Sequence, residues 1–468
     1  MPISHSPRSA RPAQPKKNRR PRLSIAIAAF ILFAIVLALT GGSSRPSIVW
    51  LISLRPVAVV CIVAMLLTGR PDWRSIAPLP ALLAAFALTI ALQLVPLPPA
   101  LWHGLPGRGV YDTVADTLGG AERWHPLALS PDRAWNSLVS LLVPLAMMTG
   151  YALLDRQKRH LLLLPLLGLV AVSMVLGVAQ VASGGTSWLY WYKVSGHGQL
   201  IGLLANRNHQ GAMLAMTLPL LRGWTLLPAP SAKAARTRML LAVSAGVVIV
   251  LYTLVLGSRA GLALALFGIV AALFVEPRLG VRFTSRQRWL IAAGVLAGIV
   301  MVVALAISAD RAVSLGRITD DDLGTEGRLA ALPTLMRIIH DTMPLGTGFG
   351  SFVPVYATYE PDALLKPTYF NNAHNDLIEL AITGGAPALA AFAAFLMWWV
   401  TACWRSVTTT GSRPWRALQR AAGFASLILL LASVVDYPLR TPLLGGIFTL
   451  LCCWLAQSPV IGSSRDDA

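Results

Sequence analysis

The chain has 468 residues, of which 55% are hydrophobic and only 13% are charged. Soluble proteins carry about 25% charged residues, so this composition excludes a disordered chain and, with its long apolar runs, a soluble globule. The formal net charge of +19 is typical of nucleic-acid binders, so its distribution along the chain decides what it means.

Twelve apolar runs approach the roughly 20 residues that one helix needs to cross a bilayer. They predict an all-α polytopic membrane protein with about twelve transmembrane helices and a large periplasmic loop that contains short amphipathic helices. The predicted spans are 23–40, 47–67, 77–97, 135–154, 161–183, 209–227, 239–257, 260–275, 290–308, 386–404, 421–435 and 441–456.

The charges orient these spans through the positive-inside rule. With the N-terminus in the cytoplasm, 25 of the 39 Lys and Arg residues and 5 of the 20 acids fall on the cytoplasmic side. The other side holds 14 basic and 15 acidic residues, and its long segments are 98–134 and 309–385. The net charge is therefore mainly a topology signal, and both termini are predicted to be cytoplasmic. Membrane lipids are an expected partner, and nucleic acid is not, because no folded nucleic-acid reader is evident.

Five parts of the chain follow from this topology. Residues 1–22 are predicted to form a disordered basic cytoplasmic tail, 23–308 the first nine spans, and 309–385 the large periplasmic loop. Residues 386–457 carry the last three spans, and 458–468 form a second cytoplasmic tail. Irregular backbone in membrane proteins is tolerated where it lines a cavity, so the large loop is predicted to be catalytic.

The large loop contains the glycine segment, Pro-Leu-Gly-Thr-Gly-Phe-Gly-Ser-Phe at 344–352. Its glycines Gly346, Gly348 and Gly350 allow tight turns and close backbone approach, and their amides could face an anionic ligand. The alternative is a plain surface turn. An amphipathic helix is predicted just before it, at 329–340.

A second polar stretch, Asn-Asn-Ala-His-Asn-Asp, follows the glycine segment. A helix is predicted to start at one of the asparagines 371–372 and to end at Gly384. At 100° per residue, His374 falls on the packed face of the first turn, while Asp376 and Glu379 point the other way. The positive helix end disfavours imidazolium, and a neutral imidazole can accept a proton from a hydroxyl. The alternative is a histidine that only packs.

Two arginines lie at predicted outer boundaries of spans, where the positive-inside rule disfavours them. Arg207 opens the sixth span, and Arg259 lies in the short turn between the seventh and eighth. Guanidinium groups bind phosphate oxygens bidentately, so this pair could hold a pyrophosphate. Arg328 is a third candidate and Arg55 a weaker one. The alternative is that these arginines are snorkelling anchors.

Metal chemistry has weaker support. The acidic run 320–322 is compatible with a divalent cation, but such runs are more often solvated loops. The four cysteines lie in or beside apolar runs, so neither a zinc site nor a disulfide framework is expected. We therefore predict no metal.

The motifs occur in a characteristic order along the chain. Asn-Arg-Asn-His at 206–209 is followed by Gly-Ser-Arg-Ala-Gly at 257–261 and, in the loop, by Gly-Arg at 327–328. The glycine segment and Ala-His-Asn-Asp-Leu-Ile-Glu at 373–379 come next. In this order the chain resembles the O-antigen ligase and O-antigen polymerase superfamily of bacterial inner-membrane proteins, with a core match over roughly 202–395.

The resemblance implies transfer of a glycan from an undecaprenyl-pyrophosphate carrier to an acceptor hydroxyl at the periplasmic face. Ligases of the superfamily use lipid A–core as the acceptor, polymerases use another carrier-linked repeat, and related members use proteins. The expected enzyme is a metal-independent inverting glycosyltransferase without a cofactor or nucleotide sugar. Its glycan could be lipopolysaccharide O-antigen, capsule or exopolysaccharide.

Residue roles carry over by motif position. The superfamily's essential loop histidine falls on His374, and its essential arginines fall on Arg207, Arg259 and Arg328. Leu-Pro at 332–333 stands where many members have an aromatic residue after the loop Gly-Arg. The predicted catalytic residues are His374, Arg259 and Arg207. The predicted substrate-binding residues are Arg328, Asn375, Asn208, Gly346, Gly348 and Gly350.

Functions other than ligase remain open. A repeat-unit polymerase would share every site motif. A transporter or lipid-linked glycan flippase would place charged or broken-helix sites near the bilayer midplane in repeated halves, whereas here the polar residues cluster in one outer loop. A structural membrane subunit would need neither His374 nor Arg259.

Overall fold

The computed structural model describes residues 24–45, 49–184, 188–192, 196–276, 286, 325–365, 370–408 and 412–457. These residues form a helical bundle with one antiparallel sheet of two short strands, in which Pro96 pairs with Pro126 and Leu97 with His125. The predicted ninth span, the acidic run 320–322 and both predicted tails lie outside the described residues.

The longer helices lie in the predicted spans, except α13, which lies in the predicted large loop. They are α1 (Ile25–Thr40), α2 (Trp50–Thr68), α3 (Pro78–Gln93), α6 (Pro131–Ser140), α7 (Leu142–Leu153), α8 (Leu163–Ala182), α9 (Arg207–Thr225), α10 (Ala232–Leu256), α11 (Arg259–Phe274), α13 (Thr325–Thr342), α15 (Asp376–Thr408), α16 (Arg413–Val435) and α17 (Pro442–Ala456). The short elements are η1 (Trp73–Ile76), β1 (Pro96–Leu97), α4 (Pro99–His103), α5 (Gly109–Thr117), β2 (His125–Pro126), η2 (Arg159–Leu162), α14 (Phe352–Tyr359), η3 (Asp362–Leu364) and η4 (Pro438–Arg440).

Six helical stretches of the described chain are long and apolar enough to cross a membrane. They are Trp50–Thr68, Pro131–Leu153, Arg159–Ala182, Ala232–Leu256, Asp376–Thr408 and Pro414–Val435. Four shorter apolar helices, α1, α3, α11 and α17, accompany them. The helical membrane architecture is thus confirmed, while the count of about twelve spans stays a prediction.

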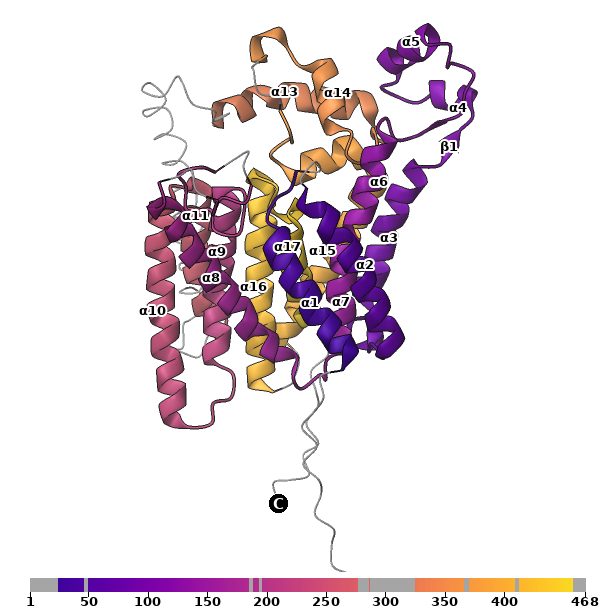
Figure 1. The fold of residues 1–468 in the computed structure, drawn as a ribbon. Helices are drawn as coiled ribbons and strands as arrows, with labels where there is room; N and C mark the ends of the chain where they lie inside the picture. The colour runs from indigo at the N-terminus through magenta and orange to yellow at the C-terminus, as the bar shows by residue number, and fades with distance from the viewer. Residues whose placement is uncertain are drawn as a thin grey trace, which may run out of the picture.

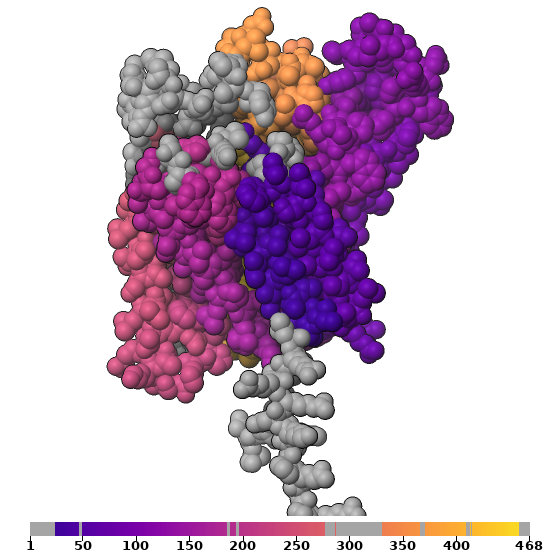
Figure 2. Space-filling view, viewed as in Figure 1, coloured from indigo at the N-terminus to yellow at the C-terminus, as the bar shows by residue number. Residues whose placement is uncertain are grey.

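The described parts of the two predicted outer segments, 98–134 and 309–385, lie at the same end of the bundle. Figure 1 places α4 and α5 of one segment and α13 and α14 of the other above the long helices. In the space-filling view they form adjacent masses, purple and orange (Figure 2). The backbone joins them where the N–H of Leu129 donates to the carbonyl of Thr347 at 2.9 Å. Which side of the membrane this end faces stays a prediction.

Irregular backbone at 196–206 leads into α9 and is held by side chains of α8. Oε1 of Gln180 accepts the N–H of Gly202, and Nε2 of Gln180 donates to the carbonyl of Gly202, both at 2.9 Å. The N–H of Leu203 donates to Oγ of Ser173 at 3.0 Å. Because unpaired backbone groups are costly away from water, these bonds allow a non-helical segment to stay buried and to fix where α9 begins.

Helices α9 and α11 cross in direct backbone contact near their N-terminal ends. A Cβ atom added to Gly211 would lie 2.8 Å from Cα of Gly261, and one added to Gly261 would lie 3.0 Å from Cα of Gly211. Small residues at a crossing allow this close approach inside a membrane. The paired glycines therefore bring the starts of the two helices together.

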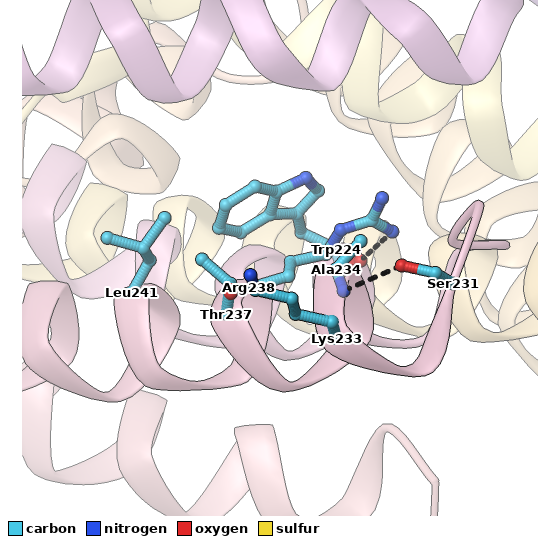
Figure 3. A pocket seen from close by; sticks show the side chains of 7 residues that line it. All are labelled: Trp224, Ser231, Lys233, Ala234, Thr237, Arg238 and Leu241. Carbon is cyan, nitrogen blue, oxygen red and sulfur yellow. Dashed lines mark hydrogen bonds between the residues drawn. The ribbon is translucent and has the colours of Figure 1, made fainter.

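The opposite end of α9 is closed by α10. Nη1 of Arg238 donates to the carbonyl of Leu227 at 2.8 Å, and its guanidinium lies 5.6 Å from the ring centroid of Trp224. Ser231 caps α10 by accepting the N–H of Ala234 at 3.1 Å. A shallow recess at this junction is lined by Trp224, Ser231, Lys233, Ala234, Thr237, Arg238 and Leu241 (Figure 3).

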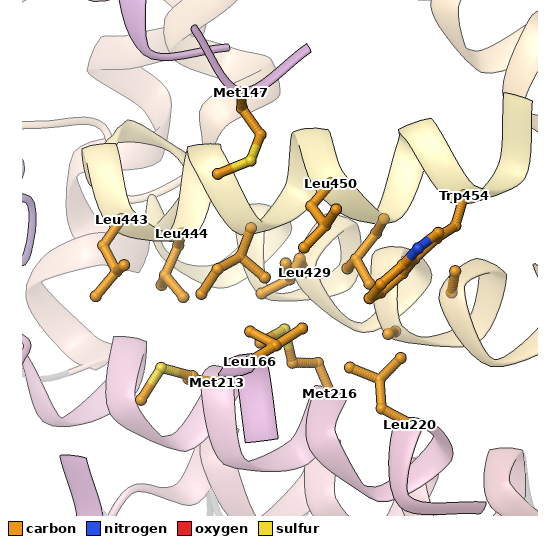
Figure 4. Packing of buried hydrophobic residues seen from close by; sticks show 14 of the residues in the cluster. Met147, Leu166, Met213, Met216, Leu220, Leu429, Leu443, Leu444, Leu450 and Trp454 are labelled. Carbon is orange, nitrogen blue, oxygen red and sulfur yellow. The ribbon is translucent and has the colours of Figure 1, made fainter. Parts of the chain in front are cut away.

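The hydrophobic core lies where α9, α16 and α17 meet. Met213 and Met216 of α9 face Leu444 and Trp454 of α17 (Figure 4). Leu429 of α16 belongs to the same cluster. All five side chains are fully buried. Close packing of this kind leaves little freedom for the helices to shift, so the residues at their ends are held in fixed places.

Replacing Gly211 with alanine is expected to lower the thermal stability of the purified protein, because the new Cβ would force α9 and α11 apart. Overpacking of this kind costs about 1–3 kcal/mol. The matched control is Gly246→Ala in α10, where the nearest atom would be 3.9 Å away. The measurement is the melting midpoint in detergent. A midpoint for G211A equal to that of G246A would contradict backbone contact between the helices.

Candidate active site

The buried carboxylate of Asp436 is the centre of the candidate site. Asp436 directly follows α16, and its side chain is only 3% exposed. Its Oδ1 lies 3.5 Å from Nδ1 of His374 and 3.8 Å from Nε2 of His209. Its Oδ2 accepts a hydrogen bond of 2.9 Å from Nδ2 of Asn208. We call these four residues the acid–histidine centre, which joins α9, the end of α16 and the segment before α15.

Aromatic rings pack against the two imidazoles of this centre. The ring centroid of Tyr437 lies 5.1 Å from that of His374 and 5.3 Å from that of His209. Phe370 lies 5.5 Å from His374, whose side chain is 11% exposed. Within the described residues Nδ1 of His374 makes no hydrogen bond. The charged group that faces this nitrogen is the carboxylate of Asp436, at 3.5 Å.

His374 lies two residues before α15 rather than inside it. The helix begins at Asp376, and Oδ1 of Asn375 accepts backbone N–H groups of its first turn at 3.0 and 3.1 Å. The prediction that the helix starts at 371–372 is therefore wrong, because Asn375 provides the cap. His374 itself has a φ of +51°, in the left-handed region that non-glycine residues seldom occupy.

Glu379 is buried, so the prediction that it points away from the packed face is also wrong. Its side chain is 4% exposed, and its Oε1 lies 2.5 Å from Nη1 of Arg440. Its other oxygen accepts the N–H of Ala373 at 2.9 Å. The ion pair with Arg440, which is distant in the sequence, therefore lets Glu379 be buried on the packed face of the helix. The helix breaks at Gly385, one residue after the predicted end at Gly384, and then continues as the second part of α15.

The predicted catalytic arginines begin the two helices that cross at the paired glycines. Arg207 is the first residue of α9 and Arg259 the first of α11, and both are half-buried. Oδ1 of Asn208 accepts a hydrogen bond of 2.8 Å from Oγ of Ser258. Hydrogen bonds thus link Ser258 to Asn208, and Asn208 to the carboxylate of Asp436. Arg207 directly precedes Asn208 in the sequence, and Arg259 directly follows Ser258. The structure brings both arginines into the region of His374, where two helix N-termini add positive partial charge.

The glycine segment joins the end of α13 to α15 and to the end of α3. Its three predicted glycines have φ angles between +71° and +96°, which confirms the predicted tight turns. Gly346 and Gly348 donate their N–H groups to backbone carbonyls of α13 and α15 at 2.9 Å, and Phe349 donates to Oε1 of Gln93 at 3.0 Å. These amides bind within the protein, so they are not directed at an anionic ligand. The segment shapes the loop by packing.

The remaining predicted groups lie elsewhere or outside the described residues. The backbone of Arg328 falls in the first turn of α13, which includes the predicted helix 329–340, but its side chain is not described. The acidic run 320–322 is outside the described residues. Arg55 lies inside α2 and donates a hydrogen bond to Asn136 of α6, which gives it a structural partner.

Residues 244–393, about a third of the chain, match the family model described as O-antigen ligase. The resemblance to the O-antigen ligase superfamily is confirmed. No curated protein matches the chain. At the level of the superfamily, this match supports a function of the O-antigen ligase or polymerase type. The matched residues include Arg259, the glycine segment and His374, whereas Arg207 and Asp436 lie outside them.

Three residues at the site were not predicted to act there: Asp436, His209 and Arg440. Asp436 carries a readable signal, because it is an acid at the end of the predicted span 421–435, which has no charged residue, and such acids are rare and often functional. His209 belongs to the same Asn-Arg-Asn-His motif as Arg207. Arg440 gives no local signal, because it pairs with acids that lie 61 and 64 positions earlier in the chain.

The recess of Figure 3 is separate from the acid–histidine centre. Trp224, which lines the recess, is 17 positions after Arg207 in α9, or about 25 Å along a helix. The guanidinium of Arg238, which also lines the recess, donates hydrogen bonds to carbonyl groups at the end of α9. The recess therefore takes no part in the candidate site.

Replacing Gly348 with alanine is expected to destabilise the loop joint, because its Cβ would lie 2.4 Å from Cα of Ala128 at a φ of +96°. Left-handed strain alone costs about 1–3 kcal/mol. The control Gly198→Ala has a φ of +74° but open space around it, so it isolates that strain. The melting midpoint of G348A should fall well below that of G198A. Equal midpoints, with weaker donor binding in G348A, would instead identify the segment as an anion cradle.

Proposed function

We propose that this chain is an O-antigen ligase-type glycosyltransferase of the bacterial inner membrane. It moves a glycan from undecaprenyl pyrophosphate to an acceptor hydroxyl, on lipid A–core or another glycan, at the periplasmic face. Both termini are cytoplasmic. The observation that carries the proposal is the meeting of His374 and a buried carboxylate with the N-terminal ends of α9 and α11.

The acceptor side of the reaction is assigned to His374. Its Nδ1 faces Asp436 at 3.5 Å, so the opposite ring nitrogen, Nε2, is the one that takes the proton of the acceptor hydroxyl. The carboxylate stabilises the imidazolium that forms and holds the ring in the required orientation. Catalytic hydrogen bonds are often longer without substrate and shorten in the complex, which fits the 3.5 Å separation.

The donor side is assigned to Arg207 and Arg259. As the pyrophosphate leaves, negative charge grows on its oxygens, and guanidinium groups bind such oxygens bidentately. Helix N-termini favour anions in the same way. Charged groups that are fixed before the reaction stabilise the transition state most strongly where water is excluded.

The reaction balances without a cofactor or a covalent enzyme intermediate. The acceptor oxygen forms a bond to the anomeric carbon as the bond from that carbon to the pyrophosphate oxygen breaks, with inversion. The acceptor proton passes to His374. Undecaprenyl pyrophosphate leaves as the anion and takes its charge compensation from the arginines.

Alanine at His374 is expected to lower the rate of glycan transfer about 10²- to 10⁴-fold, the usual contribution of a general base. Alanine at Arg259 is expected to lower it about 10²- to 10³-fold through lost charge stabilisation. Purified protein is given a carrier-linked oligosaccharide and an acceptor, and the coupled product is measured. The matched controls are His340→Ala and Arg337→Ala on α13, where the His340 side chain is 88% exposed.

Full activity of both variants at normal expression would refute the proposed mechanism. Movement of the carrier-linked glycan across the membrane without a coupled product would instead support a transporter or flippase. In cells, loss of all long chains from lipid A identifies a ligase, whereas a single-repeat band identifies a polymerase of the same superfamily.

Asparagine at Asp436 is expected to reduce the rate by about 10²-fold or more, because the side chain keeps its size but loses the charge that stabilises the imidazolium of His374. Without the carboxylate, the tautomer of His374 with its proton on Nδ1 is no longer favoured, and a ring with its proton on Nε2 cannot accept the acceptor proton there. The measurement is the transfer rate beside the melting midpoint. Wild-type transfer by D436N would remove the carboxylate from the mechanism.

A further inference from the structure

Arg440 links the segment after α16 to the first turn of α15 by two ion pairs. Its Nε lies 2.6 Å from Oδ1 of Asp376, and its Nη1 lies 2.5 Å from Oε1 of Glu379. Burial lowers the pKa of Arg440, but the two carboxylates outweigh this effect and leave its pKa above the ordinary value. The guanidinium therefore stays charged. Its fork can reach two separate carboxylates, which a single ammonium group cannot match.

Glu379 passes this contact on to the residue before His374. One carboxylate oxygen binds Arg440, and the other accepts the N–H of Ala373 at 2.9 Å. Asn375, on the other side of His374, is fixed as the cap of α15. Both chain neighbours of the histidine are thus held by hydrogen bonds, which maintains its left-handed φ of +51°.

The same short segment carries the carboxylate that faces the histidine. Asp436 and Arg440 are four positions apart, and the turn between them is closed by a hydrogen bond of 3.2 Å from the N–H of Arg440 to the carbonyl of Tyr437. One end of this turn contacts the imidazole of His374, and the other holds its backbone through Glu379. The turn therefore sets both the position and the orientation of the imidazole.

We propose that Arg440 is a positioning residue for His374, which acts through Glu379 and the backbone of Ala373. This inference rests on the proposed function, because it requires His374 to act on the acceptor. Arg440 itself touches neither donor nor acceptor. Its loss leaves the donor site unchanged but displaces the imidazole, and displacement of a reacting group by about 1 Å can lower a rate 10²-fold.

The test is the kinetics of Arg440→Lys and Glu379→Gln in the full-length protein, with carrier-linked oligosaccharide as the donor. Both variants should lower kcat at least about tenfold and change KM for the donor by less than about twofold. Asp376→Asn should have a smaller effect on kcat, because Asp376 makes no contact with Ala373 among the hydrogen bonds of the described residues.

A second arm uses the His374→Ala background. There, Arg440→Lys should lower the residual rate no further, because residues that act through one another are not additive. The matched control is Arg156→Lys, which alters an arginine–carboxylate contact of 2.7 Å with Asp72 at the other end of the bundle. It should leave kcat unchanged in both backgrounds.

Each alternative gives a different result. An increase in donor KM for Arg440→Lys would assign Arg440 to substrate binding, and a further loss of rate in the His374→Ala background would assign it to general stability. Either result overturns the inference, as does wild-type kcat in R440K and E379Q. If H374A itself keeps the wild-type rate, the proposed function fails first, whatever the Arg440 variants do.

Discussion

A carboxylate buried at the end of a membrane-spanning helix is the constraint on which the site depends. Asp436 follows α16 and is almost fully buried, and a buried charge is costly unless partners surround it. Its partners come from separate parts of the chain: the amide of Asn208 at the start of α9, and the imidazoles of His374 and His209. Satisfying one carboxylate therefore fixes the ends of three elements relative to one another.

The partners can reach the carboxylate because α9 and α11 are in close contact next to the acid–histidine centre. Gly211 and Gly261 let α9 and α11 touch, so Asn208 reaches both Ser258 and the carboxylate. Larger side chains at the crossing would separate the two helix starts and with them the arginines. The apolar packing of the bundle and the polar bonding of the site are therefore parts of one arrangement rather than independent features.

Local sequence patterns predicted the helices and turns well, but they predicted poorly which side chains form hydrogen bonds and ion pairs. Apolar runs located the helices, and alternating glycines located the tight turns of the loop. The start of α15 was misplaced because three nearby asparagines can each cap a helix, and only the packing selects Asn375. Glu379 was assigned to the solvent face because its partner Arg440 lies 61 positions further on. Periodicity reports which face a residue occupies in an isolated helix, and it carries no information on a distant counter-ion.

The surroundings of His374 bear on why the site would transfer a glycan instead of hydrolysing its donor. Water competes with the acceptor for any activated anomeric carbon, so a transferase must keep it from the base. Phe370 and Tyr437 pack on the imidazole, whose side chain is only 11% exposed. A water molecule gains little from such a surface, whereas the apolar face of a sugar ring can pack on aromatic rings. Under the proposed function, a base placed among aromatic rings favours a hydroxyl that arrives on a sugar.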